Sequence, residues 1–509
     1  MNCLNCTVQC QHDHLNNHSK IIPLFNLENK KIPEALPKEA VNLESAAFIR
    51  YVQDIGLPQI FETLPDLRQQ SRCTYSISSL SMWAFHTCAF RQGSKNAMQT
   101  SMESIATPDG KENFLHLLNM GEGVKTIPHS SVVDDALSKI DCMEFSEILL
   151  DIFDRLIEKK NFYHNQEVLL PYNNFQIGTD GFWTHHYTEP HSVDANGNNG
   201  CPYCLPRVHN RGKPDQFTTW VHVMVTFVLI CEGLTLPLYV YPLKAGQVKE
   251  DQSDANLKEQ CELAAAHIVL PLIRQRYPRL SFTFLGDSLY ANQQFVRLCE
   301  KLKFDYIIVC KDGSQKNLYK RCNALAQTEF YKQNYTREET EKIEQGTLTR
   351  KAAWFNTAEM GDVFTNVLRF EESVIKSDGS SEIIYKGAWI CSKKIFHNNC
   401  FKRVKQGRSR WNHEDLHNTL KNRGYDIKHD IARANPNLLM VWKMMMFIAF
   451  FITELFMSTI IAQGLQKTRS CMKFAKDMLQ QLIERSWEAI SLSPILIKPR
   501  VQFRFNFLS

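Results

Sequence analysis

A short stretch in the last quarter of the chain carries the residue types of a phosphate-handling site. Read as a helix at 100° per residue, residues 407–421 place five polar side chains on one stripe, namely Arg410, Glu414, His417, Asn418 and Lys421. Leu416 and Leu420 fall on the far side, as a helix anchored on a core requires. A carboxylate flanked by two cations suits a site where Glu414 holds a divalent metal ion and the cations bind phosphate oxygens. A solvated helix with ordinary ion pairs would show the same pattern.

Two aspartates follow predicted strands in the middle of the chain. Residues 175–181 read as a strand that ends in an acid, Asp180, and residues 280–286 alternate cleanly before Asp287. An acid at the end of a core strand points into the cleft where α/β folds carry out their chemistry, although an aspartate there also commonly caps the next helix. Three carboxylates, Asp180, Asp287 and Glu414, could converge on two hard cations and leave coordination positions for phosphate oxygens.

A loop rich in glycine and asparagine ends in Cys201-x-x-Cys204 and has histidines on both sides. Two cysteines and two histidines are a common ligand set for a tetrahedral zinc site. The predicted ligands are Cys201, Cys204 and His209, together with His191 or His186. Free structural cysteines are the alternative. A thioredoxin-like redox role is not favoured, because the motif lies in a loop and not at the start of a helix.

The first residues of the chain form a second cluster of soft ligands. Its members are Cys3, Cys6, Cys10, His12, His14 and His18. The spacing fits no well-defined zinc finger, so segment 1–42 is interpreted either as a zinc-binding tail or as an unstructured tail that binds metal adventitiously, followed by a connector. The 16 cysteines are scattered and no secretory apolar region opens the chain, which predicts a reducing, cytoplasmic location without disulfides.

The elements around these residues follow first a helical and then an α/β pattern. Helices are predicted at 44–55, 76–90, 94–105, 130–140 and 144–159, with a turn at 108–110, so 43–162 is interpreted as a helical, candidate DNA-binding domain. Strands are then predicted at 216–230, 234–243, 280–286 and 305–310, together with helices at 256–277 and 291–302. This order predicts an α/β catalytic fold.

Residues 312–387 are rich in charge and are predicted to form an inserted subdomain, with a helix at 337–345 and strands at 362–375 and 381–385, ahead of a core strand at 388–392. Further on, segment 438–461 is apolar enough to raise the question of a membrane span. Lys443 and Glu454 interrupt it, and the charge-free run 444–453 is too short to cross a bilayer. We therefore expect a buried helix of the catalytic core and no membrane partner.

Positive charge is concentrated in one segment. The whole chain has a formal net charge of only +5. Residues 392–434 hold eleven Lys and Arg against four Asp and Glu, which exceeds the net charge of the whole chain. Such a segment is a candidate footprint for a phosphate backbone, although a charge run is more often only a solvated face.

With these residues identified, the chain resembles the DDE transposases of bacterial insertion sequences, in the IS-four-like group with a strand-rich insertion before the final Glu. Thr179-Asp180-Gly181 is similar to the first-acid segment, and Leu285-Gly286-Asp287-Ser288-Leu289-Tyr290-Ala291 to the second. Arg410, Glu414 and Lys421 match the signature Y-x-x-R-x-x-x-E-x-x-x-x-x-x-K around the third acid, except that its Tyr position is Gly407 here. The resemblance covers about 162–463.

The resemblance implies an RNase H-like catalytic core made of 163–311 and 388–463, with an inserted strand-rich subdomain at 312–387. The helical region 43–162 would precede it and a C-terminal region with helices, 464–509, would follow. Asp180 would lie on the first strand, Asp287 after the fourth strand and Glu414 on a helix behind them.

The resemblance also implies a DNA transposase that cleaves and joins strands at insertion-sequence ends by two-metal phosphoryl transfer. Asp180 would bridge two Mg²⁺ ions, for which Mn²⁺ could substitute, and Asp287 and Glu414 would hold one each. Arg410 and Lys421 would contact the DNA backbone. The implied partners are the terminal repeats, target DNA and a second copy of the chain. The alternatives are a catalytically decayed DNA-binding protein and a metal-dependent nuclease that cuts without joining.

Overall fold

The computed structural model describes residues 43–103, 108–120, 124–158, 174–231, 233–245, 254–311 and 315–497. They form two compact units. One is built from the described residues of Met1–Arg155 and Val441–Asn506, and the other from those of Leu156–Met440. The predicted cysteine- and histidine-rich tail and its connector, 1–42, lie outside the described residues, as does 498–509.

The first unit is helical and joins segments from the two ends of the chain. Its N-terminal elements are α1 (Glu44–Ile55), α2 (Leu57–Phe61), α3 (Ile77–Ala89), α4 (Lys95–Glu103), α5 (Pro108–Leu117), α6 (Ser130–Leu137) and most of α7 (Cys142–Glu158). Its C-terminal elements are most of α16 (Pro436–Met457), α17 (Ile460–Gln466), α18 (Cys471–Glu484), α19 (Trp487–Ser491) and α20 (Pro494–Ile497). The N-terminal helices predicted from the sequence are confirmed to within a few residues, but the turn predicted at 108–110 is the start of α5.

Buried polar contacts bind the two groups of helices of this unit together. Asn113 on α5 donates from Nδ2 to the carbonyl oxygens of Leu482 and Arg485, at 2.8 and 2.7 Å. The backbone N–H of Ser45 on α1 donates to Gln481 Oε1 on α18 at 3.0 Å. Helix α18 therefore belongs to the same core as the N-terminal helices, a relationship that the sequence did not indicate.

Helix α16 is buried almost all round. By length and composition it could cross a membrane, but 94% of its apolar window is buried inside the protein, as in the core helix of a globular domain. The ring of Phe456 lies 5.2 Å from that of Phe48, and the ring of Trp442 lies 6.3 Å from that of Trp83. The predicted buried helix is confirmed. Its assignment to the catalytic core is corrected, because from Val441 onward the helix belongs to the helical unit.

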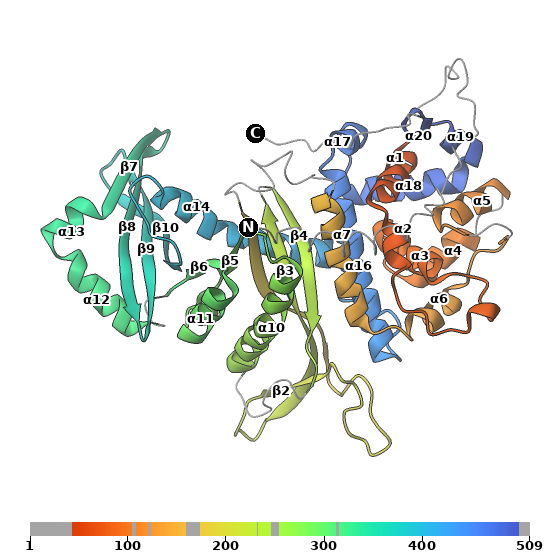
Figure 1. The fold of residues 1–509 in the computed structure, drawn as a ribbon, viewed down its shortest axis with the longest axis horizontal. Coiled ribbons are helices and arrows are strands. Elements are labelled where there is room, and N and C mark those ends of the chain that lie inside the picture. The colour runs from red at the N-terminus through yellow and green to blue at the C-terminus, as the bar shows by residue number, and fades with distance from the viewer. Residues whose placement is uncertain are drawn as a thin grey trace, which may run out of the picture. The chain divides into compact units, whose positions relative to one another are not determined.

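The second unit is built on one mixed sheet of ten strands, shown in Figure 1. The strands are β1 (Phe175–Tyr187), β2 (Leu205–His209), β3 (Phe217–Cys231), β4 (Leu234–Pro242), β5 (Phe282–Gly286), β6 (Asp305–Val309), β7 (Thr336–Ile343), β8 (Gly346–Met360), β9 (Val363–Lys376) and β10 (Ser381–Cys391). The helices are α10 (Asp254–Arg276), α11 (Gln293–Leu302), α12 (Lys316–Ala326), α13 (Glu329–Asn334), α14 (Cys400–Arg408) and α15 (Asn412–Asn422). The predicted α/β pattern is confirmed.

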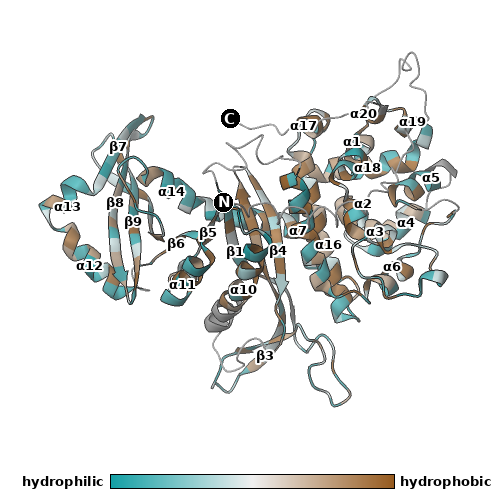
Figure 2. Cartoon of the chain, in the orientation of Figure 1, coloured by the Kyte–Doolittle hydropathy of each residue, from teal (hydrophilic) through white to brown (hydrophobic). Residues whose placement is uncertain are grey.

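The strand order is β2-β3-β1-β5-β6-β10-β9-β8-β7, with β4 also paired to β3. Strands β1, β5 and β6 are parallel, while β3 runs antiparallel to β1 and β4 antiparallel to β3. Strands β1, β3 and β4 are mostly hydrophobic, as Figure 2 shows, because helices pack on them. The fold is thus a mixed α/β unit accompanied by helices from both ends of the chain.

The charged segment after β6 extends the same sheet. Strand β10 pairs with β6 of the core at Trp389↔Val309 and with β9 along its whole length, so the core strand predicted at 388–392 and the strand predicted at 381–385 are one element. The helix predicted at 337–345 is wrong, since residues 336–343 form β7, which pairs with β8 along its whole length. Its charges meet partners across the sheet: Arg350 of β8 pairs with Glu341 at 2.9 Å, and Lys351 pairs with Glu338 at 3.2 Å.

Candidate active site

The two aspartates lie at the same level of neighbouring parallel strands. Gly178 of β1 is paired with Leu285 of β5, so two residues further on Asp180 is level with Asp287. Strand β1 continues to Tyr187, and Asp180 is therefore in the middle of its strand and not at its end as predicted. Asp287 does follow the end of β5, and its Oδ1 accepts the backbone N–H of Leu289 at 2.9 Å, which is the capping role that an aspartate commonly has after a strand.

Helix α15, which carries Glu414, is held on the strand of Asp180 by two histidines. The Nε2 atoms of His413 and His417 lie 2.7 and 3.1 Å from the hydroxyl oxygen of Thr226 on β3. That hydroxyl also lies within hydrogen-bond distance of the carbonyl oxygen of Asp180, at 3.2 Å. His417 Nδ1 is 3.8 Å from Asp180 Oδ2. The helix register of Glu414 is thereby fixed relative to Asp180.

The polar stripe predicted on this helix is only partly correct. Glu414 and Asn418 are exposed and Leu416 and Leu420 are buried, as expected, but His417 is buried. Arg410 lies in a short 3₁₀ turn, η4 (Ser409–Trp411), between α14 and α15. Of the two predicted phosphate contacts, Lys421 lies near Asp180: its ammonium is 4.9 Å from the ring centre of Phe182, which follows Asp180 on the same strand face. The Arg410 guanidinium lies 4.9 Å from the ring centre of Trp411.

Among the described residues, Asp180, Asp287 and Glu414 do not bring even one carboxylate oxygen each within 4.8 Å of one another. Asp180 is half-buried, with 25% of its side chain exposed, whereas Glu414 is exposed. The structure therefore places two acids on adjacent strands and the third on a helix packed against those strands, without drawing the three carboxylates into one tight group.

Gly407 lies where a side chain has no room. A Cβ atom at Gly407, on α14, would lie 2.7 Å from the indole Nε1 of Trp389 on β10. Trp389 is itself buried, and its ring stacks with that of Tyr385 at 6.5 Å. The indole fills the space into which a side chain at position 407 would point.

A buried carboxylate that sequence reasoning missed lies behind the two aspartates. Glu262 on α10 is 2% exposed, and its Oε1 accepts the backbone N–H of Gly181 at 3.1 Å. A Cβ at Gly181 would meet Glu262 Oε1 at 2.5 Å, so the contact requires glycine beside Asp180. Because Gly181 and Asp180 face opposite sides of β1, Glu262 approaches from the face opposite to α15. The signal in the sequence was one acid before a long apolar helical run.

Two groups in the site have strongly shifted pKa values. Burial raises the pKa of the Tyr290 hydroxyl well above its usual range, and the charges of Glu262, Asp287 and Asp180 raise it further, so negative charge accumulates at this point of the sheet. Burial lowers the pKa of His413 well below its usual range, and the neighbouring His417 and Arg410 act in the same direction. His413 is therefore neutral at physiological pH.

The cysteine loop is folded against β3. Cys201 and Cys204 Sγ lie 3.4 and 3.1 Å from Nε2 of His222, a strand residue that was not predicted as a ligand. Ligand atoms of His191, Cys201 and His222 all lie within 4.8 Å of one another, so the predicted His191 and Cys201 come together. The predicted Cys204 contacts this group through His222.

His209 does not join this cluster. Its ring is hydrogen-bonded through Nε2 to the Thr219 hydroxyl at 2.8 Å and stacks on Phe217 at 4.5 Å. The side chain of His186 is not among the described ones. A hydrogen bond from Cys204 lowers the pKa of Cys201, to which the rings of His191 and His222 also contribute, and the same contact raises the pKa of Cys204.

The basic segment 392–434 is partly neutralised within the protein. Lys393 forms an ion pair with Asp305, and Arg408 pairs with Glu372 at 3.1 Å while its guanidinium lies 4.3 Å from the ring centre of Tyr385. Such pairing reduces the number of cations that can contact a polyanion. Lys421 of this segment lies beside the ring of Phe182, two residues after Asp180.

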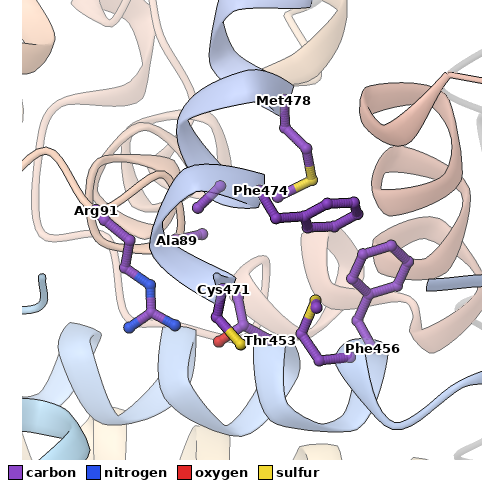
Figure 3. Close-up of a pocket in the computed structure, with 9 residues that line it drawn as sticks. Ala89, Arg91, Thr453, Phe456, Cys471, Phe474 and Met478 are labelled. Carbon is purple, nitrogen blue, oxygen red and sulfur yellow. The ribbon is translucent and has the colours of Figure 1, made fainter. Parts of the chain in front are cut away.

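A small pocket shown in Figure 3 belongs to the helical unit. It is lined by residues of α3, α16 and α18 and of the turn after α3, mainly Ala89, Arg91, Thr453, Phe456, Cys471, Phe474 and Met478. Its lining is largely apolar and contains neither the candidate acids nor the residues of the cysteine cluster, so it has no part in their chemistry.

A scan against protein-family models gave no match for this chain, and a search of curated proteins found no similar one.

Proposed function

We propose that this chain is a DDE transposase that cleaves and joins DNA at insertion-sequence ends. The observation that carries the proposal is the placement of the three acids. Asp180 and Asp287 lie level on adjacent parallel strands, and the helix of Glu414 is fixed on the strand of Asp180 through Thr226. Three acids from distant points of the sequence are thus carried by elements that pack together.

The order of elements supports the RNase H-like core that the resemblance implies. Leaving aside the short hairpin strand β2, Asp180 lies on the first core strand, Asp287 follows the fourth, and Glu414 lies on a later helix. The charged insertion falls between β6 and α14, ahead of the final Glu, as the same resemblance implies.

The residues present fit hard divalent cations. Carboxylate oxygens are the donors that Mg²⁺ prefers, and Asp180 and Asp287 lie level on adjacent strands. Asp180, Asp287 and Glu414 would hold the ions. When bound, two Mg²⁺ ions, or Mn²⁺ in their place, would act as Lewis acids on the phosphate and lower the pKa of the attacking hydroxyl or water.

The protein itself would position the DNA. Lys421 and Arg410 lie on either side of Glu414 along the chain, and each cationic contact to a phosphate would add affinity that falls as salt rises. Buried His413 and His417 would keep the helix of Glu414 in register with Asp180, so the carboxylates are oriented before DNA binds. We further propose that the chain acts in the cytoplasm as a homodimer on paired element ends.

The experiment is cleavage of a labelled linear DNA that carries the end of the flanking element, with Mg²⁺ or Mn²⁺ and with neither. The variants are Asp180→Asn, Asp287→Asn and Glu414→Gln. Asp415→Asn is the matched control, because Asp415 is an exposed acid next to Glu414 on the same helix. We expect the first three to lose about two orders of magnitude in cleavage rate or more and the control to equal the wild type.

Three other outcomes separate the alternatives. Metal-dependent cleavage without joining of the new 3′-ends to target DNA would identify a nuclease. No cleavage by the wild type, with a shifted band in a binding gel, would identify a decayed DNA-binding protein. Equal cleavage by wild type and Asp287→Asn would show that the assignment of the acids is wrong.

A further inference from the structure

We propose that Cys201, Cys204, His222 and His191 form a structural Zn²⁺ site that fixes the loop between β1 and β2 on strand β3. This ligand set differs from the one expected from the sequence, because His222 takes the place of His209. The site does not depend on the proposed catalytic function.

The two thiols lie near His222 at almost the spacing of ligands in a tetrahedral site. With Zn–S near 2.3 Å and Zn–N near 2.0–2.1 Å, sulfur and nitrogen ligands of one ion stand about 3.6 Å apart. The Sγ atoms of Cys204 and Cys201 are 3.1 and 3.4 Å from His222 Nε2. Ligand atoms of His191, Cys201 and His222 lie within 4.8 Å of one another. To admit the ion, the thiols and His222 would separate by a few tenths of an ångström, and His191 would have to reach the same spacing.

The ring of His191 has buried nitrogen atoms that the protein leaves unsatisfied. Both of them lack a hydrogen-bond partner among the described residues, and one of them could bind the ion. His222 would bind it through Nε2, which already lies near both thiols. Buried polar groups are almost always paired, so a missing partner points to an unseen ligand. The ring of Tyr187 lies 5.6 Å from that of His191 and 5.3 Å from that of His222, and forms an apolar wall beside them.

The loop is folded so that both thiols point at the same place. The backbone N–H of Cys204 donates to the carbonyl of Cys201 at 3.3 Å, closing a tight turn. Asn199 holds both ends of this turn, accepting the N–H of Cys201 at 3.0 Å and donating to the carbonyl of Cys204 at 3.1 Å. The backbone N–H of His191 donates to Cys204 Sγ at 3.3 Å. An N–H donated to sulfur stabilises the thiolate that a metal requires.

The chemistry of the four ligands indicates which metal ion would bind and that its role would be structural. Two thiolates and two imidazoles in a tetrahedral arrangement favour Zn²⁺ over Mg²⁺ or Ca²⁺, which prefer oxygen. Four protein ligands leave no open position, so the ion would hold the loop and would not take part in catalysis. The loop leads directly into β2, so the ion would fix the start of the β2–β3 hairpin.

The test measures zinc in the purified full chain, made with Cys3, Cys6 and Cys10 replaced by Ser so that the tail contributes no thiols. We expect one zinc per chain. Cys204→Ser and His222→Asn should lose most of it. His209→Asn and Cys231→Ser are the matched controls, since His209 lies on the same hairpin and Cys231 is a buried cysteine of β3 outside the cluster. Both should keep the metal.

A second measurement uses the unmutated cluster, so that the test does not depend on whether the variants fold. Cobalt loaded into the unmutated cluster should give the intense visible and near-ultraviolet absorption of tetrahedral Co²⁺ with thiolate ligands, and zinc should displace it. The proposal is overturned if the chain binds neither metal, or if a Cys201–Cys204 disulfide forms instead, seen as a mass lower by two hydrogen atoms. Loss of zinc in His209→Asn but not in His222→Asn would also overturn it. None of these readouts uses DNA cleavage.

Discussion

Thr226 is the residue on which the geometry of the candidate acids depends most directly. It is fully buried on β3, opposite Asp180, and its single hydroxyl is shared by two histidines and one carbonyl oxygen. A valine of the same shape would leave these buried partners unpaired. A side chain that never touches the substrate can therefore control where Glu414 stands.

We predict that Thr226→Val lowers the free energy of unfolding by about 1–3 kcal/mol, the cost of leaving buried polar groups unsatisfied. It should also slow metal-dependent cleavage, because Glu414 would lose its fixed register. Urea unfolding and the cleavage assay check the two effects. Thr218→Val, on the same strand near its exposed end, serves as the control and should change neither.

From the lowered pKa of His413 we predict that the folded protein loses stability in acid. Its pKa in the folded protein is far below the value of about 6.5 that it has when unfolded, so the unfolded chain binds the extra proton. Stability contributed by neutral His413 is complete above pH 6.5 and falls as the pH drops, by about 1.4 kcal/mol per pH unit. Buried His86, whose pKa is lowered to about 3 by burial, adds a slope of the same sign.

Urea unfolding midpoints at pH 7.5, 6.5 and 5.5 test this prediction. The wild type should lose stability between pH 6.5 and 5.5, and His413→Gln should lose less over the same interval while keeping the part due to His86. An unchanged slope in His413→Gln would mean that His413 is already protonated in the folded protein.

Some of these residues were predictable from the sequence and others were not. Asp287 could be predicted, because a segment with the clean alternation of a strand ends just before it. His222 and Glu262 were not predictable. His222 lies inside an apolar run and meets the thiols only through pairing of β2 with β3. Glu262 precedes an apolar run and meets Gly181 only through packing of α10 on β1. His209 was chosen for its closeness to Cys204 along the chain, whereas strand pairing brings His222 to the thiols.

At the scale of elements, α14 packs closely on β10 because Gly407 has no side chain to meet the Trp389 ring. A glycine inside a helix normally destabilises it relative to alanine, by about 1 kcal/mol. Here the sign should reverse, because the added methyl group would lie against the Trp389 ring. The glycine is kept by packing and not by backbone conformation.

We predict that Gly407→Ala lowers the free energy of unfolding by about 1–3 kcal/mol through overpacking. Gly464→Ala is the matched control. Gly464 is also inside a helix, α17, but a Cβ there would meet nothing within 4 Å. That variant should gain up to about 1 kcal/mol. Equal stabilisation by both changes would contradict the packing of Gly407 on Trp389.

The insertion shows why element types can fail to follow from local sequence. The sequence predicts a helix at 337–345, in a segment rich in charge, whereas residues 336–343 form β7. The observed strand uses the same charges across the sheet, to Arg350 and Lys351 of β8. A short charged segment satisfies both patterns locally, and the partner strand, which lies later in the chain, decides between them.

At the scale of the whole molecule, the helical unit needs both ends of the chain. Phe474 on α18 is fully buried, and its ring lies 6.3 Å from that of Phe456 on α16. The C-terminal helices are therefore part of the core that includes the N-terminal ones. The α/β unit has its own sheet and its own buried core.

We predict that Phe474→Ala destabilises the helical unit by about 3–5 kcal/mol, the usual cost of removing a buried phenyl ring. Calorimetry should then show the transition of the helical unit at a lower temperature and that of the α/β unit unchanged. Met472→Ala on the same helix, at a side chain that is 38% exposed, should move neither transition. A common shift of both transitions would mean that the units unfold as one.

Because the helical unit is divided between the two ends of the chain, its core cannot be completed until translation is nearly finished. The 285 residues of Leu156–Met440 must be translated after the N-terminal helices and before the helices that complete their core. At about 5–20 residues per second, the N-terminal helices wait about 15–60 s on the ribosome with apolar faces uncovered. A chain that terminates early would keep that surface exposed, so premature products of this gene should be strong substrates for chaperones and proteases.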